Sequence, residues 1–106
     1  MGGQTSHRAD ILSVSNANPC VVTTSAEHGY STYDFVRLTD LNGAMPTKRG
    51  VDPLNNYKFR IIVTGVDSFK LQNPITFEYI DSTNFTPYVE GGYCNLVENE
   101  FQYEGD

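Results

Sequence analysis

The stretch "NYKFRIIV" (residues 56–63) places every second side chain on one face, which carries Tyr57, Phe59, Ile61 and Val63. A period of two is typical of a β-strand with one buried face. The stretch "PITFEYI" (74–80) repeats the pattern, with Ile75, Phe77 and Tyr79 opposite Thr76 and Glu78. We therefore predict that both stretches are strands and that these apolar faces pack into a core.

Shorter apolar stretches extend the pattern along the chain, whereas helical periodicity is nearly missing. The further candidate strands are 11–15, 20–25, 34–39, 68–72 and 93–97, and turn-forming residues separate them. Short strands with a turn signal every several residues predict an all-β fold, a small antiparallel β-barrel or sandwich. The predicted core is Val22, Val36, Leu38, Tyr57, Phe59, Ile61, Val63, Phe69, Leu71, Phe77 and Tyr79.

The length of 106 residues is that of one domain. We divide the chain into an N-terminal arm (1–10), a barrel domain (11–97) with a long loop at 40–53, and an acidic C-terminal arm (98–106). A loop of this length is more often functional than idle. The C-terminal arm "ENEFQYEGD" alternates aromatic and polar residues, which a frayed tail seldom needs, although fraying is the simpler alternative.

From these segments we predict residues that contact partner proteins: Met45, Lys48, Arg49, Phe101 and Tyr103. The arms and the loop are poor in core-type residues, so contacts outside the domain would explain them. The expected partners are neighbouring subunits that meet head to tail and close into a ring or lattice. The expected state is therefore a homo-oligomer in an assembled particle.

The net charge of −6 disfavours direct binding to DNA phosphates, which requires clustered Lys and Arg. An acidic surface would instead suit a protein that DNA slides past. No apolar segment approaches the length of a membrane span, and no secretion signal follows Met1. We therefore expect synthesis in the cytoplasm, no membrane partner, and reduced thiols.

The sequence contains few residues in the patterns that catalytic sites require. Cys20 and Cys94 share no metal-type spacing and lie in apolar contexts, so we predict free, buried thiols, with a disulfide as the alternative. His28 precedes a glycine, and we predict a structural turn there. The aspartates beside turn formers are expected to cap turns: Asp40, Asp52, Asp67 and Asp81. We predict a non-enzymatic protein without metal or cofactor.

The stretch "DSTNFTPYVEGGYC" (81–94) combines turn formers, aromatic residues and paired glycines. Asp81 and Ser82 can cap a tight turn, and Phe85 and Tyr88 can seal one end of a small barrel. Gly91-Gly92 permits a sharp reversal into the last strand. We therefore interpret this stretch as a barrel-closing motif and not as a reaction centre.

Four segments in order resemble a repeated module of tailed-bacteriophage virion proteins: "NANPCVVTTSAEHGYSTYDFVRL" (16–38), "LNNYKFRIIV" (54–63), "DSFKL" (67–71) and "DSTNFTPYVEGG" (81–92). That module is similar to the first catalytic-cysteine half-domain of ubiquitin-activating enzymes, a small β-barrel. This chain keeps Asp34 of the module's "GD" pair, loses the glycine, and adds the insertion 40–53. The resemblance implies no catalytic cysteine here, because fold does not imply function.

The resemblance implies a structural protein of a phage virion, and the single copy with two arms favours a small stand-alone subunit at the tail or neck. A capsid decoration protein is one alternative, since a barrel with arms could clip between capsomers. A carbohydrate- or receptor-binding module is the other, because the loop aromatics Tyr30, Tyr33 and Tyr88 could stack on sugar rings.

Overall fold

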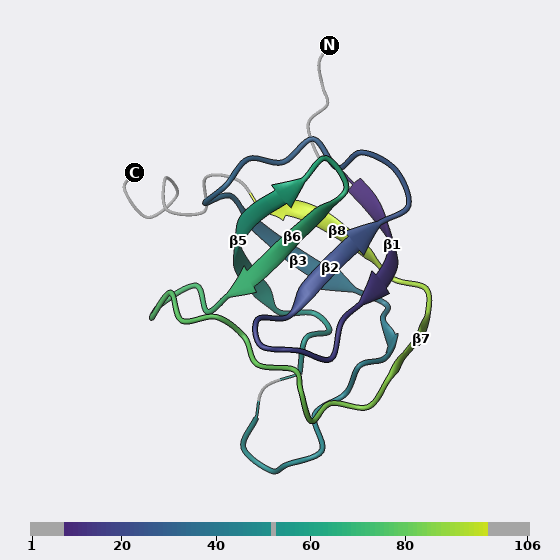
Figure 1. The fold of residues 1–106 in the computed structure, drawn as a ribbon, viewed down its shortest axis with the longest axis vertical. Helices are drawn as coiled ribbons and strands as arrows, with labels where there is room; N and C mark the ends of the chain where they lie inside the picture. The colour runs from purple at the N-terminus through teal and green to yellow at the C-terminus, as the bar shows by residue number, and fades with distance from the viewer. Residues whose placement is uncertain (1–7, 52, 98–106) are drawn as a thin grey trace, which may run out of the picture.

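The computed structural model describes residues 8–51 and 53–97, and in these residues all regular structure is β-strand. The strands are β1 (Arg8–Val14), β2 (Val21–Thr24), β3 (Phe35–Thr39), β4 (Asn42–Gly43), β5 (Lys58–Gly65), β6 (Ser68–Gln72), β7 (Tyr88–Glu90) and β8 (Tyr93–Val97). Six strands close an antiparallel barrel in the order β1-β2-β6-β5-β3-β8 (Figure 1), and β4 pairs with β7 outside it. The predicted all-β barrel is confirmed.

Side chains alternate between buried and outer positions along the barrel strands, and the buried ones form the core. In β5 the side chains of Phe59 and Ile61 are buried, while Lys58 and Arg60 lie on the outer face. Strand β6 pairs with β5 through Ile61 and Leu71, so the inward rows of the two strands meet. The prediction of burial is confirmed for Val22, Val36, Leu38, Phe59, Ile61, Phe69 and Leu71. Val63 is half-buried and packs against this core.

The stretch 74–80 is not a strand, and this prediction was wrong. It forms a turn in which the Asn73 side chain accepts hydrogen bonds from the backbone of Ile75 (2.8 Å) and Thr76 (3.0 Å). Phe77 then takes a positive φ of 67°, and only Tyr79 makes a single bridge, to Gln72. The turn folds back over the outer face of β6, so its alternating apolar residues lie outside the barrel wall.

Three predicted core residues are therefore exposed. Phe77 is 50% exposed, Tyr79 is 43% exposed, and Tyr57, which precedes β5, is 42% exposed. In their place the core includes residues that the sequence pattern did not select. These are Ala9, Ile11, Val14, Tyr30, Leu41, Ala44 and Leu54, and the core also includes Cys20 and Cys94, which were predicted to be buried.

One predicted segment boundary and one predicted property of the long loop also change. Arg8, Ala9 and Asp10, which we assigned to the N-terminal arm, pair with β8 as the start of β1. The loop 40–53 is not uniformly poor in core residues, because Leu41 and Ala44 are buried. Its strand β4 pairs with β7 of the closing motif, and the loop is tied down at that point.

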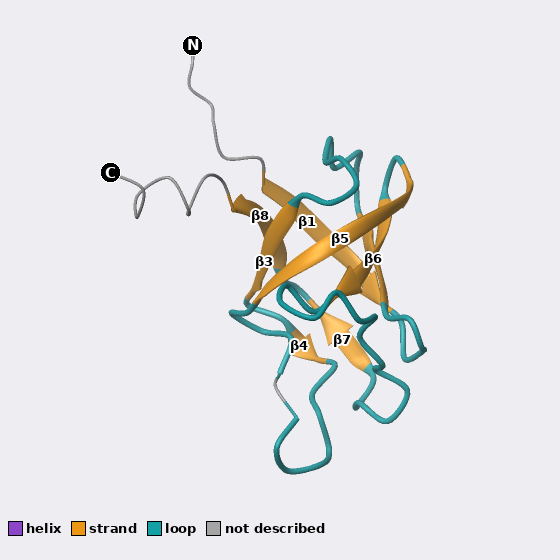
Figure 2. Ribbon diagram, turned by 90° about the vertical axis from the view of Figure 1, so that its left-hand side faces the viewer, coloured by secondary structure: helices purple, strands orange, loops and turns teal. Residues whose placement is uncertain are grey.

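The described chain ends and the long loop lie at opposite ends of the barrel. Figure 2 shows the start of β1 and the end of β8 at the upper end and the β4–β7 pair, with the loop that follows β4, at the lower end. Val97, the last described residue, pairs with Phe35 at the start of β3.

Candidate interaction surfaces

The closing motif is held by buried hydrogen bonds. The hydroxyl of Ser82, which is fully buried, donates to the Ser15 carbonyl (2.6 Å) and accepts from the Ala17 amide (3.1 Å). The carboxylate of Asp81 accepts from the Thr83 amide (2.9 Å), and hydrogen bonds from Thr83 lower the pKa of Asp81. Asp81 and Ser82 thus hold a turn against the 15–17 segment, as the sequence predicted.

Two further side chains join this motif to the barrel. The Asn16 amide donates to the carbonyls of Phe85 (3.0 Å) and Thr86 (3.2 Å), and the Tyr88 hydroxyl donates to the carbonyls of Ile11 (3.2 Å) and Gly91 (2.8 Å). Phe85 and Tyr88 pack against the core. The interpretation of 81–92 as a barrel-closing element is consistent with every one of these contacts.

His28 has a structural environment. Its ring is buried, its Nδ1 accepts from the Tyr30 amide (2.9 Å), and its Nε2 lies 2.9 Å from the Gly65 carbonyl. The ring also stacks on Tyr30, with centroids 5.2 Å apart. Because both ring nitrogens bind backbone groups, His28 fixes the turn into Gly29, whose φ is +74°.

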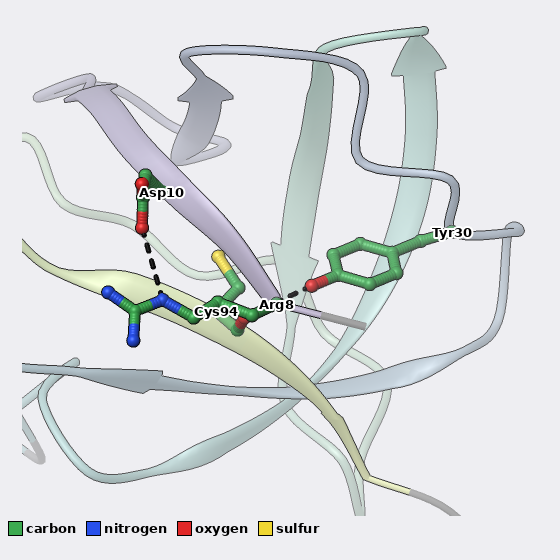
Figure 3. Close-up of polar contacts among 4 residues, drawn as sticks. All are labelled: Arg8, Asp10, Tyr30 and Cys94. Carbon is green, nitrogen blue, oxygen red and sulfur yellow. Dashed lines mark hydrogen bonds and ion pairs between the residues drawn. The ribbon is translucent and has the colours of Figure 1, made fainter. Parts of the chain in front are cut away.

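The two thiols are buried and free, as predicted. Burial raises the pKa of Cys20, and it raises the pKa of Cys94 to about 12, so both remain protonated at neutral pH. Figure 3 shows Tyr30 donating its hydroxyl proton to the Cys94 carbonyl (3.1 Å), beside the exposed Arg8–Asp10 ion pair (3.2 Å). Tyr30 is thus buried and unavailable for the stacking on sugar rings considered above.

The predicted contact residues of the long loop are at the surface. Met45, Lys48 and Arg49 are exposed, and the Met45 backbone is fixed by Thr86, whose amide donates to the Met45 carbonyl (2.8 Å). Lys48 lines a hollow of about 160 Å³ together with Asp81 and Phe85. Phe101 and Tyr103 lie outside the described residues.

A larger groove of about 400 Å³ runs between the segment 51–59 and the turn 73–81. Its walls include Tyr57, Lys58 and Phe59 on one side and Ile75, Tyr79 and Ile80 on the other. Val51, Leu54 and Phe85 form part of the same lining. Ile75 is 85% exposed at its edge. We call this feature the apolar groove.

Cations and aromatic rings alternate beside the apolar groove. The Arg60 guanidinium lies between the rings of Tyr33 (4.3 Å) and Phe77 (3.8 Å). Lys70 lies 5.5 Å from the ring of Tyr79, and Lys58 lies 5.5 Å from the ring of Phe35. These contacts hold the turn 73–79 against the outer face of β5 and β6. Nε of Arg60 and Oε1 of Gln72 have no hydrogen-bond partner among the described residues.

Sequence reasoning missed this surface because it assigned Phe77 and Tyr79 to the core. The available signal was the turn-forming stretch "QNP" (72–74), which comes directly before the alternating residues. An Asn-Pro pair directly before an apolar stretch favours a turn that continues into that stretch.

Two further features are absent from the described residues: a metal-binding cluster and a membrane-spanning helix. No three of the His, Cys, Asp and Glu residues within 8–51 and 53–97 lie close enough together to hold a metal ion. The same part of the chain has no helix that is long and apolar enough to cross a membrane.

Comparison with known proteins finds similarity to ubiquitin-like modifier-activating enzyme 1. The chain is 32% identical to the Rattus norvegicus enzyme and 30% identical to the Homo sapiens enzyme, in each case over 92 residues, or 85% of this chain. It resembles a fragment of these enzymes. The aligned region is only 7% of their length, and no protein-family model matches the chain. The predicted likeness to a β-barrel region of ubiquitin-activating enzymes is thereby confirmed, whereas the likeness to phage virion proteins stays a prediction.

Proposed function

We propose that the chain is a non-enzymatic structural subunit of a tailed-bacteriophage virion, a small tail or neck protein that assembles with other virion proteins and with copies of itself. One observation carries the proposal. The motif residues that resemble the virion module close and brace the barrel, while exposed apolar side chains gather on the loops that this motif supports. An arrangement of this kind presents a contact surface on a rigid scaffold.

The environment of the reactive side chains supports a role without catalysis. His28 uses both ring nitrogens to bind backbone groups, and Cys20 and Cys94 are buried thiols with raised pKa values. A catalytic thiol needs a lowered pKa and access to substrate. The similarity to modifier-activating enzymes covers only 7% of their length, and a shared barrel does not imply their activity.

The charge balance supports a place near passing DNA. The chain carries 13 acidic and seven basic residues, and a surface of that sign repels phosphates. A tail or neck ring has to let DNA through without holding it. The same balance would not serve a subunit that anchors DNA by phosphate contacts.

The test is the location of the chain in purified particles. Virions of the source phage are banded on a density gradient, and the chain is quantified by mass spectrometry against the major capsid protein. We expect a fixed copy number per particle, in tails separated from heads. Absence from particles would refute the proposal. Recovery with heads at capsomer stoichiometry would refute the tail or neck position in favour of capsid decoration, and specific binding of the isolated chain to a glycan would favour the sugar-binding alternative.

A further inference from the structure

Basic and acidic residues are segregated between the barrel strands and the loops. The six barrel strands contain five of the seven basic residues but only one of the 13 acidic residues, Asp10. Four of these cations lie on three neighbouring strands: Arg37 on β3, Lys58 and Arg60 on β5, and Lys70 on β6. Burial alternates along these strands so that the four side chains lie on the outer face, and Arg37 is the cross-strand partner of Lys58.

Exposed aromatic rings complete this outer face. Tyr33, which is 60% exposed, and Phe77 lie on either side of the Arg60 guanidinium, and Tyr79 lies beside Lys70. Neither Arg60 nor Lys70 forms an ion pair with another described residue. Arginine and tyrosine side chains are enriched at the energetically important centres of protein interfaces. We call the four cations and these three rings the cationic wall.

The turn between β5 and β6 has the opposite charge. Glu27 and Asp67 are exposed carboxylates, and neither has an ion-pair partner within the described part of the chain. The His28 amide donates to the Val66 carbonyl (3.0 Å), so the segment that carries Glu27 runs beside the turn. Val66 is 67% exposed and lines a hollow of about 490 Å³ together with Glu27. We call Glu27, Val66 and Asp67 the acidic end.

We propose that the acidic end of one copy of the chain docks on the cationic wall of a second copy. In this contact the two carboxylates lie near Arg60 and Lys70, and Val66 packs on the exposed rings. Complementary charges of this kind fix the register of an interface and exclude other partners. The inference rests on the proposed function, which calls for contacts between copies, and it names the two surfaces that make them.

The occupant is a second copy because one chain cannot bring its own two patches together. Residues 66–67 form the turn that joins β5 to β6, so the same two strands fix both patches and point them in different directions. Figure 2 shows β5 across the near face between β3 and β6, with the turn at the upper end. A contact between two different patches leaves each bound copy with a free wall or a free end. It therefore propagates to a ring or a longer assembly.

The carboxylates nearest the cationic wall do not cancel its charge. Asp34 precedes β3, and its carboxylate accepts a hydrogen bond from the Ser31 amide (2.9 Å). Glu78 lies in the turn 73–79, between two of the aromatic residues. These two carboxylates stand beside four cations, so the wall keeps a positive charge that the acidic end complements.

The lower end of the barrel is a poorer match for the wall. Its exposed acids Asp40 and Glu90 flank the β4–β7 pair, but the loop that follows β4 carries the exposed cations Lys48 and Arg49. The net charge of −6 makes two copies repel each other at long range. At physiological ionic strength the Debye length is about 8 Å, so the charges inside the contact decide the outcome.

Four full-length variants test the assignment by sedimentation velocity over a range of concentrations. Glu27→Lys reverses a charge of the acidic end, and Glu90→Lys is its matched control at the lower end. Lys70→Glu reverses a charge of the cationic wall, and Lys48→Glu is its matched control in the long loop. Urea unfolding followed by circular dichroism checks that each variant is folded.

We expect the wild-type chain and the two controls to self-associate alike. Glu27→Lys and Lys70→Glu should each raise the dissociation constant at least about tenfold, because each places like charges opposite each other. An equimolar mixture of these two variants should recover association. In the mixture the intact wall of one variant meets the intact end of the other, and the two reversed charges also attract.

Any of four results would overturn the inference. The wild-type chain could stay monomeric at all concentrations, as it would if its own residues 98–106 covered the wall. The two patch variants could associate like wild type, or their mixture could fail to recover association. Binding of a single-stranded oligonucleotide that Lys70→Glu weakens and Lys48→Glu does not would assign the wall to nucleic acid instead. None of these results changes the location of the chain in particles, so the proposed function is tested separately.

Discussion

Gly43 lies where the long loop crosses the closing motif, and its replacement tests whether that crossing stabilises the fold. Gly43 has a φ of +90°, and an added Cβ would lie 2.3 Å from the Pro87 carbonyl oxygen and 2.7 Å from the Val89 amide nitrogen. Gly50 has a similar φ of +81°, but an added Cβ there meets nothing within 4 Å. The pair Gly43→Ala and Gly50→Ala therefore separates the steric clash from the cost of a left-handed backbone.

The expected free energies differ clearly. A left-handed alanine costs about 1–2 kcal/mol, and the stiffer unfolded chain returns about 0.4–1 kcal/mol, so Gly50→Ala should lower the free energy of unfolding by about 1 kcal/mol. Gly43→Ala must in addition open the β4–β7 pair. It then loses hydrogen bonds such as that from the Ala44 amide to the Pro87 carbonyl (3.1 Å), each worth about 1 kcal/mol, and exposes the buried Ala44. We expect a total loss of about 3–4 kcal/mol.

Urea unfolding followed by circular dichroism measures the difference. If both variants keep the wild-type slope, the shift in midpoint reports stability alone, and Gly43→Ala should shift it about three times as far as Gly50→Ala. Equal shifts would show that the β4–β7 contact adds nothing to stability. The loop would then be an appendage, and its contacts with the closing motif would not contribute to stability.

Three further perturbations test the core, the closing motif and the thiols. Phe59→Ala should lower the free energy of unfolding by about 3–5 kcal/mol, because the ring is buried. A much smaller loss, measured by calorimetry, would show that the ring is not part of the core. Ser82→Ala should cost about 1–3 kcal/mol, because it leaves the Ser15 carbonyl and the Ala17 amide without their buried partner; an unchanged urea midpoint would contradict this role. The double change Cys20→Ala with Cys94→Ala should leave the chain folded and able to assemble. Because the folded pKa of Cys94 is raised from 9.0 to about 12, its contribution to stability is complete below pH 9 and is lost as the pH rises toward 12, so the double variant should show a shallower loss over that range.

The strands of the barrel could be predicted from the sequence because alternation and burial agree there. In β3, β5 and β6 each predicted inward residue meets another inward residue across the pair, as Ile61 meets Leu71. The closing motif could also be predicted, because turn formers at Asp81, Ser82, Gly91 and Gly92 leave few other conformations. The alternating residues of each strand and the turn formers of the closing motif were sufficient to predict these elements.

The surface formed by the turn 73–79 could not be predicted, because alternation does not show whether a residue faces the inside or the outside of the barrel. Phe77 and Tyr79 alternate like a buried strand, yet the Asn73 turn carries them over the outside of β5 and β6, where Arg60 and Lys70 contact their rings. The buried side chain of Leu41 was missed for the opposite reason, since it stands alone in a polar loop. Both errors concern contacts between segments distant in sequence, which a single stretch does not encode.

Phe77 combines these points in a final prediction. A phenylalanine at φ 67° carries a backbone cost of about 1–2 kcal/mol, and its exposed contact with Arg60 returns only about 0.5–1 kcal/mol. Such a residue is poorly explained by folding and better explained by a contact with another molecule. Phe77→Gly relieves the strained backbone and removes the ring, so the free energy of unfolding should change by less than about 1 kcal/mol. If Phe77→Gly instead destabilised the chain as much as Phe59→Ala, Phe77 would belong to the core, and the alternation of 74–80 would have been the better guide.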